Sequence, residues 1–299
     1  IESLFKHLLA SDGSDLHLME GEIPKIRCHG RLQRIKGHDP LDSKTITLYM
    51  QHLCTRSEWN HFIKTGDLDF AYELEGAARF RANYYNQHHG KAAVFRTVPT
   101  DIKSLNQLGL PPVLKQLGKE LSGLILVTGP TGSGKSTTLA ALLHEINLHQ
   151  SRYILTLEEP IEFVHSNNKS FFCQREVGRD MPGFQAGLRA ATRQNCDVIL
   201  VGEMRDYETI SLALSAATMG KLVLGTLHTN SAIKTVNRII DAFPPDEQWK
   251  ARNMLADGLQ GICAQILLKK KGGKGRMAAN EILLSTQGLA SSIREGDTS

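Results

Sequence analysis

One short stretch, residues 124–136, constrains this chain more than any other part of it. An apolar run of strand character at residues 124–127 leads into a complete G-x-x-x-x-G-K-[ST] phosphate-binding loop between Gly129 and Ser136. Apolar residues then recur at the i, i+3, i+4, i+7 spacing of a helix face over residues 139–146. Glycines let consecutive backbone N–H groups turn toward an anion, and the N-terminus of the following helix adds partial positive charge. We therefore predict a strand, a loop and a helix that bind the phosphates of a nucleotide.

The loop also supplies the side chains that a nucleoside triphosphate requires. Lys135 is expected to contact the β- and γ-phosphates, and the Ser136 hydroxyl is expected to bind Mg²⁺. ATP or ADP, together with Mg²⁺, are accordingly the expected cofactors. The candidate nucleotide-binding residues are Gly129, Thr131, Gly132, Ser133, Gly134, Lys135, Ser136 and Thr137.

Length and periodicity predict two domains. At 299 residues the chain is long for one domain and sufficient for two cores. Residues 1–98 include segments such as 68–74, in which apolar and polar residues alternate, and we predict a small α+β domain built mostly from an antiparallel meander. Residues 99–112 contain three prolines and are expected to form a partly extended linker.

Strands and helices alternate from residue 113 to residue 299. This pattern predicts an α/β domain with a mainly parallel sheet and helices on both faces. Ligands of such sheets bind beyond the carboxyl ends of the strands, so those ends are where the chemistry is expected. The expected strands are residues 124–128, 153–157, 198–201 and 222–227, and the helices expected after the loop helix are residues 183–194 and 207–217.

Acidic residues follow two of these strands. Glu158 and Glu162 come after the second strand and are candidates for holding Mg²⁺ or its water shell, although a solvated turn explains them equally well. Glu203 follows the third strand and suits the carboxylate that orients or deprotonates the attacking water. Gly202 replaces the aspartate that commonly precedes such an acid. Metal binding is therefore expected to depend on Ser136, the phosphates and one of the first two acids.

A histidine follows the fourth strand. A lone histidine at a strand end is usually structural, bonded to a neighbouring carbonyl. Because His228 follows a strand of the candidate phosphate site, we favour γ-phosphate sensing, since an imidazole can donate to a phosphate oxygen. Thr226 and Thr229 beside it add hydroxyl donors.

Composition argues against several other classes. The five cysteines are scattered and never form a C-x-x-C pair, so neither a disulfide framework nor a zinc site is expected, as in a reducing cytoplasm. The net charge of +4 does not demand a nucleic-acid partner, and the basic run at residues 269–276 is interpreted as a solvated hairpin. No apolar stretch approaches the roughly 20 residues that span a bilayer.

Taken together, the motifs carry a family resemblance. Four of them resemble the sequence boxes of the type II/IV secretion ATPase superfamily. These are the phosphate loop, L-E-E-P-I-E at 157–162, V-I-L-V-G-E-M-R-D at 198–206 and G-T-L-H-T at 225–229. Further stretches narrow the resemblance to the type IV pilus retraction ATPases. These are D-L-H-L at 15–18, R-F-R-x-N at 79–83, F-R-T-V-P at 95–99 and Q-R-E-V at 174–177.

This resemblance implies an architecture and an activity. It implies a PAS-like domain over residues 1–98, a RecA-like ATPase domain over residues 113–299, and a homohexameric motor that hydrolyses ATP to power pilus retraction and twitching motility. It further implies that Arg81 and Arg96 reach the phosphates when the cleft between the domains closes. The alternative for Arg81 is a solvated strand arginine.

The resemblance also implies partners and a location. It places the protein in the cytoplasm at the inner face of the bacterial inner membrane, held there peripherally through a protein partner. The expected partners are an inner-membrane pilus platform protein and a paralogous pilus ATPase, with no nucleic acid among them.

Some positions depart from the family pattern and keep other functions open. Glu159, Lys221 and Asn280 stand where the family commonly has Asp, His and His, and residues 287–295 keep only part of a C-terminal segment linked to retraction. The first alternative is an ATP-gated accessory or adaptor ATPase, which a turnover assay separates from a motor. The second is a pilus-extension or type II secretion motor, disfavoured because no four-cysteine zinc insertion is present.

Overall fold

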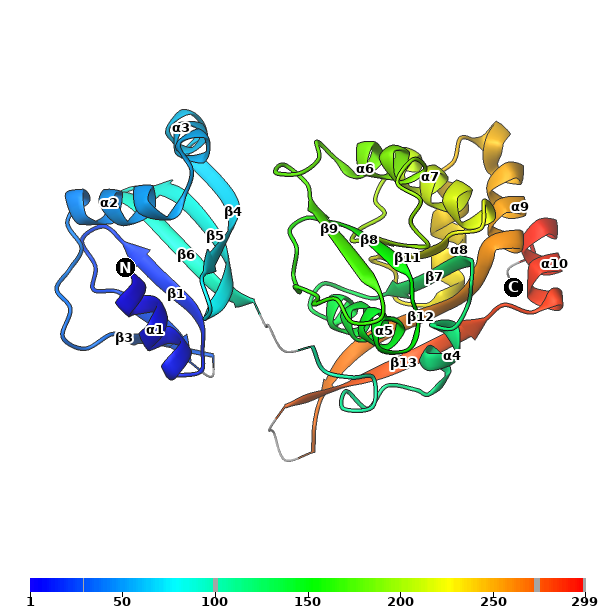
Figure 1. Cartoon of the computed structure of the whole chain (residues 1–299), viewed down its shortest axis with the longest axis horizontal. Helices are drawn as coiled ribbons and strands as arrows, with labels where there is room; N and C mark the ends of the chain where they lie inside the picture. The colour runs from blue at the N-terminus through cyan, green and yellow to red at the C-terminus, as the bar shows by residue number, and fades with distance from the viewer. Residues whose placement is uncertain (29, 99–101, 272–274, 298–299) are drawn as a thin grey trace. The chain divides into compact units, whose positions relative to one another are not determined.

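The structure, a computed structural model, describes residues 1–28, 30–98, 102–271 and 275–297. The chain divides into two compact units, Ile1–Thr100 and Asp101–Ser299, which Figure 1 colours from blue to cyan and from green to red. The expected linker begins at Pro99, which lies outside the described residues.

The first unit contains an antiparallel sheet. Within the described part of this unit the strand order is β3–β2–β1–β6–β5–β4, and β4, β5 and β6 form the expected meander. The strands are β1 Gly13–Met19, β2 Lys25–Cys28, β3 Arg31–Arg34, β4 Asp67–Leu74, β5 Ala78–Gln87 and β6 Gly90–Val98. The helices are α1 Glu2–Ala10, α2 Ser43–Leu53 and α3 Arg56–Thr65.

The period-two alternation of these strands gives the sheet one apolar face, on which the three helices pack. Phe5 of α1, Met50 of α2 and Phe62 of α3 are completely buried in one core with Phe80 and Tyr84 of β5. The Tyr84 hydroxyl donates to the carbonyl of Met50 at 3.0 Å, so the one polar atom of this buried ring has a partner. The helix-free face is left with the polar side chains of the same strands.

The second unit contains a mainly parallel sheet, as expected. Over its described residues the strand order is β13–β12–β7–β11–β10–β8–β9, and every neighbouring pair is parallel except β12 and β13. The strands are β7 Gly123–Thr128, β8 Tyr153–Glu158, β9 Phe171–Glu176, β10 Val198–Val201, β11 Leu222–Leu227, β12 Leu259–Lys269 and β13 Arg276–Leu284. The helices are α4 Val113–Leu117, α5 Lys135–His149, α6 Phe184–Ala191, α7 Tyr207–Thr218, α8 Ala232–Asp241, the 3₁₀ helix η1 Pro245–Glu247, α9 Gln248–Gly258 and α10 Gln287–Glu295.

The central strands of this sheet are buried on both faces. Ile125 of β7 packs in one core with Leu142 of α5, whereas the adjacent Leu126 packs in a second core with Leu214 of α7. Strands covered on both sides read as continuous apolar runs, which is why residues 124–127 show no alternation. The prediction of helices on both faces is confirmed.

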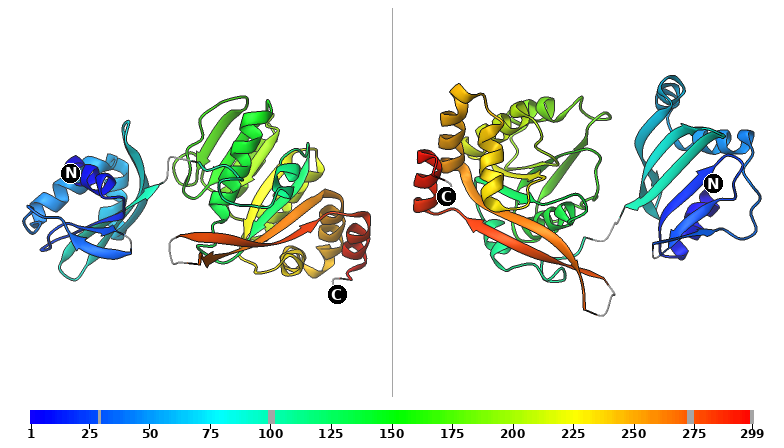
Figure 2. Two further views of the ribbon diagram at one scale, coloured as in Figure 1. Left: turned by 90° about the horizontal axis from the view of Figure 1, so that it is seen from below. Right: turned by 180° about the vertical axis from the view of Figure 1, so that it is seen from behind.

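The structure adds elements that the sequence analysis did not predict. The edge strand β9 extends the sheet beyond β8, and β12 and β13 form the long ribbon that runs from orange to red in Figures 1 and 2. Lys269 of β12 pairs with Arg276 of β13, so the basic run interpreted as a hairpin lies at the end of this ribbon, and residues 272–274 within it lie outside the described residues. Leu105 and Leu110, inside the expected linker, are buried in the same core as Leu142. This part of the expected linker therefore contributes side chains to the core of the second unit.

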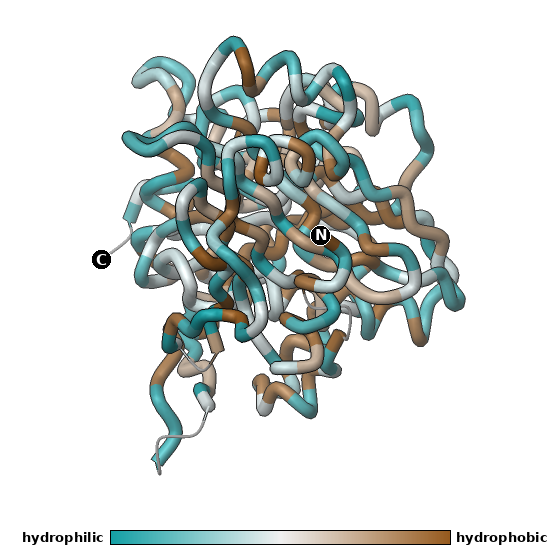
Figure 3. The backbone as a smooth tube through the Cα atoms, turned by 90° about the vertical axis from the view of Figure 1, so that its left-hand side faces the viewer, coloured by the Kyte–Doolittle hydropathy of each residue, from teal (hydrophilic) through white to brown (hydrophobic). Residues whose placement is uncertain are grey.

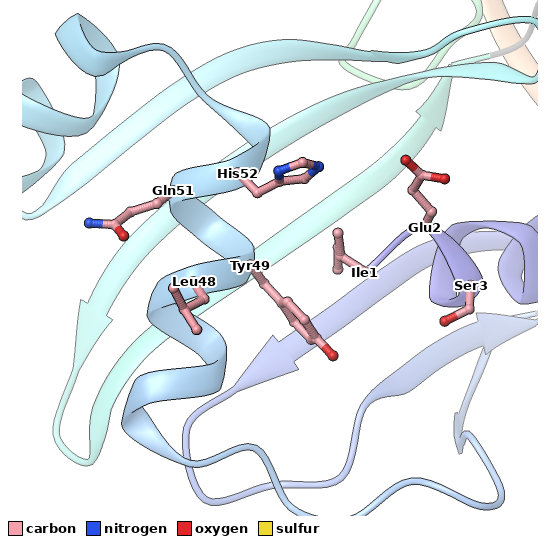
Figure 4. A pocket seen from close by; sticks show the side chains of 7 residues that line it. All are labelled: Ile1, Glu2, Ser3, Leu48, Tyr49, Gln51 and His52. Carbon is pink, nitrogen blue, oxygen red and sulfur yellow. The ribbon is translucent and has the colours of Figure 1, made fainter.

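Two further features bear on function. Short hydrophobic and hydrophilic stretches interleave along the backbone in Figure 3, and none of the described helices has the length and apolarity needed to cross a membrane. A cavity of about 710 Å³ lies between the start of α1 and α2, lined by residues such as Glu2, Tyr49 and His52 (Figure 4). This cavity belongs to the first unit and contains none of the predicted site residues.

Candidate nucleotide-binding and hydrolysis site

The phosphate loop connects β7 to α5, as predicted. Gly129, Gly132 and Gly134 have φ angles of 142°, 78° and 86°, in the region that favours glycine. Gly134 is also the N-cap of α5, so the loop turns directly into the helix N-terminus. The three glycines are therefore required by the backbone path that aims the loop amides at an anion.

Lys135, in the first turn of α5, folds back over the loop. Its Nζ donates to the carbonyl oxygens of Gly129 at 2.9 Å and Pro130 at 3.1 Å, and only 9 % of the residue is exposed. Burial lowers the pKa of Lys135, while the carboxylates of Glu203 and Glu162 act in the opposite direction. The two predicted acids thus act electrostatically on the predicted phosphate-binding lysine.

Adjacent strands bring the predicted groups together at one edge of the sheet. The backbone N–H of Gly202 donates to the carbonyl of Leu157 at 2.8 Å, and that of Met204 donates to the carbonyl of Thr226 at 3.0 Å. The N–H of Gly129 donates to Leu227 at 3.3 Å, which ties the phosphate loop to β11. The loop, the acids and the histidine therefore follow the carboxyl ends of neighbouring parallel strands.

Glu203 is held by the side chains of His228 and Arg205. Its Oε1 lies 2.9 Å from Nε2 of His228, and the guanidinium of Arg205 bonds both carboxylate oxygens, with Nη2 at 2.6 Å from Oε2. Partial burial raises the pKa of Glu203, but the Arg205 hydrogen bond and the His228 and Arg205 charges outweigh burial, so the pKa is lowered overall. Glu203 is ionised at neutral pH, as a base that acts on water must be.

Glu158 and Glu162 have different environments. Glu158 is buried, and its carboxylate accepts from Thr156 Oγ1 at 2.7 Å, from Gln174 Nε2 at 3.3 Å and from the Glu162 backbone N–H at 3.3 Å. Burial raises the pKa of Glu158 to about 7. Glu162 is exposed, and its charge acts on Lys135. Of the two acids, Glu162 is the one free to turn toward a bound ion.

Packing explains the glycine before Glu203. A Cβ atom at Gly202 would lie 3.2 Å from the carbonyl oxygen of Leu157 and 3.3 Å from the Cα of Glu158. The end of β10 lies too close to β8 to accept a side chain at this position without displacement of the β8 backbone. Position 202 therefore contributes no carboxylate beside Glu203.

The two threonines beside His228 are engaged by the protein. Thr226 Oγ1 donates to the carbonyl of Gly202 at 2.5 Å, and Thr229 Oγ1 lies 2.6 Å from Thr235 Oγ1. Both hydroxyls therefore hold strand ends and loops in place. His228 itself is partly exposed beside Glu203, which leaves its predicted γ-phosphate contact as a proposal.

Arg81 and Arg96 belong to the first unit, whereas Lys135 belongs to the second. They are directly opposite each other on β5 and β6, and both are exposed on the helix-free face of their sheet. Arg96 Nε donates to Asp15 Oδ1 at 2.9 Å. Burial raises the pKa of Asp15, but hydrogen bonds from Ser14 and Arg96 outweigh it and lower the pKa overall. The action of either arginine on phosphate stays a prediction.

The sequence analysis missed three residues beside these sites. Arg205 holds Glu203, Asp15 holds Arg96, and Gln265 of β12 bonds the phosphate loop. Arg205 and Asp15 lie inside quoted motifs, so their positions were visible although their contacts were not. Gln265 lies in no motif.

The fold and this site define a P-loop ATPase. The chain matches the family described as type II/IV secretion system protein over residues 1–296, and it belongs to that family. It is 48% identical to the type IV pilus retraction ATPase PilT of Pseudomonas aeruginosa over 282 residues, which are 94% of this chain and 81% of that protein. It is 45% identical to a twitching motility protein of Neisseria gonorrhoeae, with 91% and 72% of the two chains covered.

A solved structure shows the same fold. The crystal structure of the pilus retraction motor PilT with bound ADP matches with a TM-score of 0.96 and 42% identity, over all of this chain and 87% of that one. The family resemblance and the expected fold class, a two-domain α/β ATPase, are thereby confirmed.

Proposed function

We propose that this protein is an ATP-hydrolysing motor that powers type IV pilus retraction and so twitching motility. Similarity to a pilus retraction ATPase and to a twitching motility protein over more than nine-tenths of the chain supports this proposal. The observation that carries it is that the phosphate loop with Lys135, and Glu203 with its partner His228, follow the carboxyl ends of neighbouring parallel strands. An accessory protein that only senses nucleotide has no need of a positioned base, so the presence of Glu203 favours a motor.

In this proposal each group has a separate task. The amides of the phosphate loop and the Lys135 ammonium bind the phosphates, and Lys135 exchanges its bonds to Gly129 and Pro130 for phosphate oxygens. Glu203 orients the attacking water and accepts its proton. His228 contacts the γ-phosphate, and Arg81 and Arg96 of the first unit neutralise charge that develops during transfer.

The chemistry of the donor set fits Mg²⁺. Across the described residues there is no group of three or more His, Cys, Asp or Glu side chains suited to hold a metal ion alone. Mg²⁺ typically keeps waters and binds one or two protein oxygens together with substrate phosphates, so a sparse protein site is the expected one. Ser136 and Glu162 are the residues that would hold it, with Glu158 as the less accessible alternative. When bound, the ion neutralises charge on the phosphate oxygens.

The proposal extends to assembly and location. The motor acts as a homohexamer at the cytoplasmic face of the bacterial inner membrane. It associates there with an inner-membrane pilus platform protein and a paralogous pilus ATPase.

The test compares the purified chain with its Lys135→Ala variant. The wild-type chain is expected to hydrolyse ATP in the presence of Mg²⁺ and to restore twitching to a strain that lacks its retraction ATPase. Lys135→Ala is expected to lose ADP binding and turnover, because no other cation in the loop replaces this one. Unchanged affinity and rate in the variant would refute the site. ATP turnover without restored twitching would support the ATPase activity and refute the role in pilus retraction.

A further inference from the structure

The side chain of Gln265, on strand β12, forms a hydrogen bond to the phosphate loop. Its side chain is buried, with 2 % of the residue exposed, and its Nε2 donates to the carbonyl oxygen of Ser133 at 2.6 Å. The backbone is equally close, since a Cβ atom at Gly129 would overlap the carbonyl oxygen of Gln265. The loop therefore lies directly against this strand.

Three contacts fix the orientation of the Gln265 amide. Its Oε1 accepts hydrogen bonds from Thr138 Oγ1 of α5 at 2.8 Å and from Asn280 Nδ2 of β13 at 3.1 Å. Asn280 also lies 3.2 Å from Cys263 Sγ through the same nitrogen. With its acceptor oxygen occupied by two donors, Gln265 can direct only its NH₂ group toward the loop.

This orientation has a consequence for the phosphate site because a peptide unit is planar and trans. The carbonyl of Ser133 and the N–H of Gly134 belong to one peptide unit and point in opposite directions. Holding the Ser133 carbonyl toward β12 therefore turns the Gly134 N–H away from β12. The loop amides on that opposite side are the ones that face the phosphates.

We propose that Gln265 is a positioning residue of the phosphate loop, which fixes the Ser133–Gly134 peptide so that its N–H faces the bound nucleotide. The inference rests on the proposed ATP site and adds a residue to it from the β12–β13 ribbon. Asn280, which stands where the family commonly has histidine, supports the arrangement as the donor that orients Gln265. The ribbon thereby acts on nucleotide affinity through hydrogen bonds, without contacting the nucleotide.

The test is the substitution Gln265→Met, which keeps the length of the side chain and removes its amide. We expect ADP affinity to fall roughly five- to tenfold, the effect of one lost hydrogen bond of ordinary strength. The loop amide binds phosphate equally before and during transfer, so the KM for ATP should rise in parallel while kcat stays within about threefold. A merely structural role would lower the active fraction and hence kcat, with KM unchanged.

Two variants serve as controls. Thr138→Val removes one of the two donors that orient Gln265 and leaves Asn280 as the other, so its ADP affinity should fall less than that of Gln265→Met. Lys135→Ala reports on the site itself in the same titration. If Lys135→Ala loses ADP and Gln265→Met binds it as wild type does, the positioning role is refuted while the site stands. If Lys135→Ala also binds ADP as the wild type does, the proposed nucleotide site itself is refuted.

A second substitution covers the case in which Gln265→Met does not fold. Gln265→Asn keeps a polar amide in the buried site but is one methylene shorter, so it cannot bond Ser133 and Thr138 together. We expect it to lose ADP affinity to a similar extent. Wild-type affinity in a folded Gln265→Asn protein would overturn the proposal.

Discussion

Nε2 of His228 lies 2.9 Å from Oε1 of Glu203. The same carboxylate is also bonded by Arg205, so both of its oxygens have protein donors. A carboxylate held in this way is oriented and ionised, but it has few lone pairs left for water. If Glu203 activates water as proposed, one of these contacts must be exchanged for the water, and Arg205, whose side chain is 70% exposed, is the partner that can move at least cost.

The first prediction concerns the role of Glu203. Glu203→Gln keeps the size of the side chain and removes its basicity, so ATP turnover should fall by roughly 10² to 10⁴, the contribution of a positioned base. ADP affinity should stay near wild type. Steady-state hydrolysis and an ADP titration measure the two quantities. Glu75→Gln, in the exposed turn between β4 and β5, is a control that should change neither.

A different result would reassign the residue. If Glu203→Gln loses Mg²⁺-dependent nucleotide binding while the bound enzyme keeps its rate, Glu203 is a metal ligand. The base would then be sought at Glu162, the other acid that acts on Lys135.

The site could be predicted from the sequence to the extent that its chemistry is local. The phosphate loop is one continuous motif, and the rule that ligands bind at the carboxyl ends of parallel strands places Glu203 and His228 near it before any coordinates. The environment of an acidic side chain, in contrast, is formed by residues that are distant in the sequence. Glu158 and Glu162 look equivalent in sequence, but the contacts of Gln174 on β9 with Glu158 separate them, and β9 was not predicted.

Hydrogen bonds between residues far apart in the chain could not be predicted from the sequence. Gln265 bonds a loop residue 132 positions earlier, and Asp15 bonds Arg96 across 81 positions. Both contacts depend on which strands are neighbours, β12 beside β7 and β1 beside β6. No periodicity within a single segment carries that information.

The second prediction concerns pH and the buried Glu158. Because burial raises its folded pKa to about 7, the folded state binds a proton more tightly than the unfolded chain does. This contribution to stability is complete below the unfolded pKa near 4.5 and is lost as the pH rises through about 7. Glu158→Gln should remove that dependence of stability on pH. As the pH rises over this range, the free energy of unfolding of the variant should therefore increase relative to that of the wild type by on the order of 3 kcal/mol.

Thermal or urea unfolding of both proteins between pH 4.5 and 8 measures this difference, and Glu162→Gln is the exposed control. A difference in unfolding free energy that stays constant with pH would mean that Glu158 is ionised in the folded protein. The preference for Glu162 as the Mg²⁺ ligand would then rest on its exposure alone.

The last prediction concerns the two arginines of the first unit. Arg81 and Arg96 are exposed cross-strand neighbours, and the ion pair of Arg96 with the buried Asp15 orients one of the two. Exposed arginines gain little from such a pair in stability, so their side chains are free to serve another group. If they neutralise charge during phosphoryl transfer, Arg81→Ala and Arg96→Ala should each slow ATP hydrolysis at least about tenfold. This is less than the 10³ to 10⁵ of a single arginine acting alone, because two share the task.

ADP affinity should stay near wild type in both variants, since ADP lacks the γ-phosphate on which the arginines act. Asp15→Asn tests the pair from the other side. It leaves Arg96 in place but removes the charge that orients it, so its rate should fall between wild type and Arg96→Ala. Arg34→Ala, on the exposed strand β3, controls for loss of positive charge. If both arginine variants hydrolyse ATP at the wild-type rate in the assembled ring, the arginines are solvated strand residues. A coupling of the first unit to hydrolysis would then require another group.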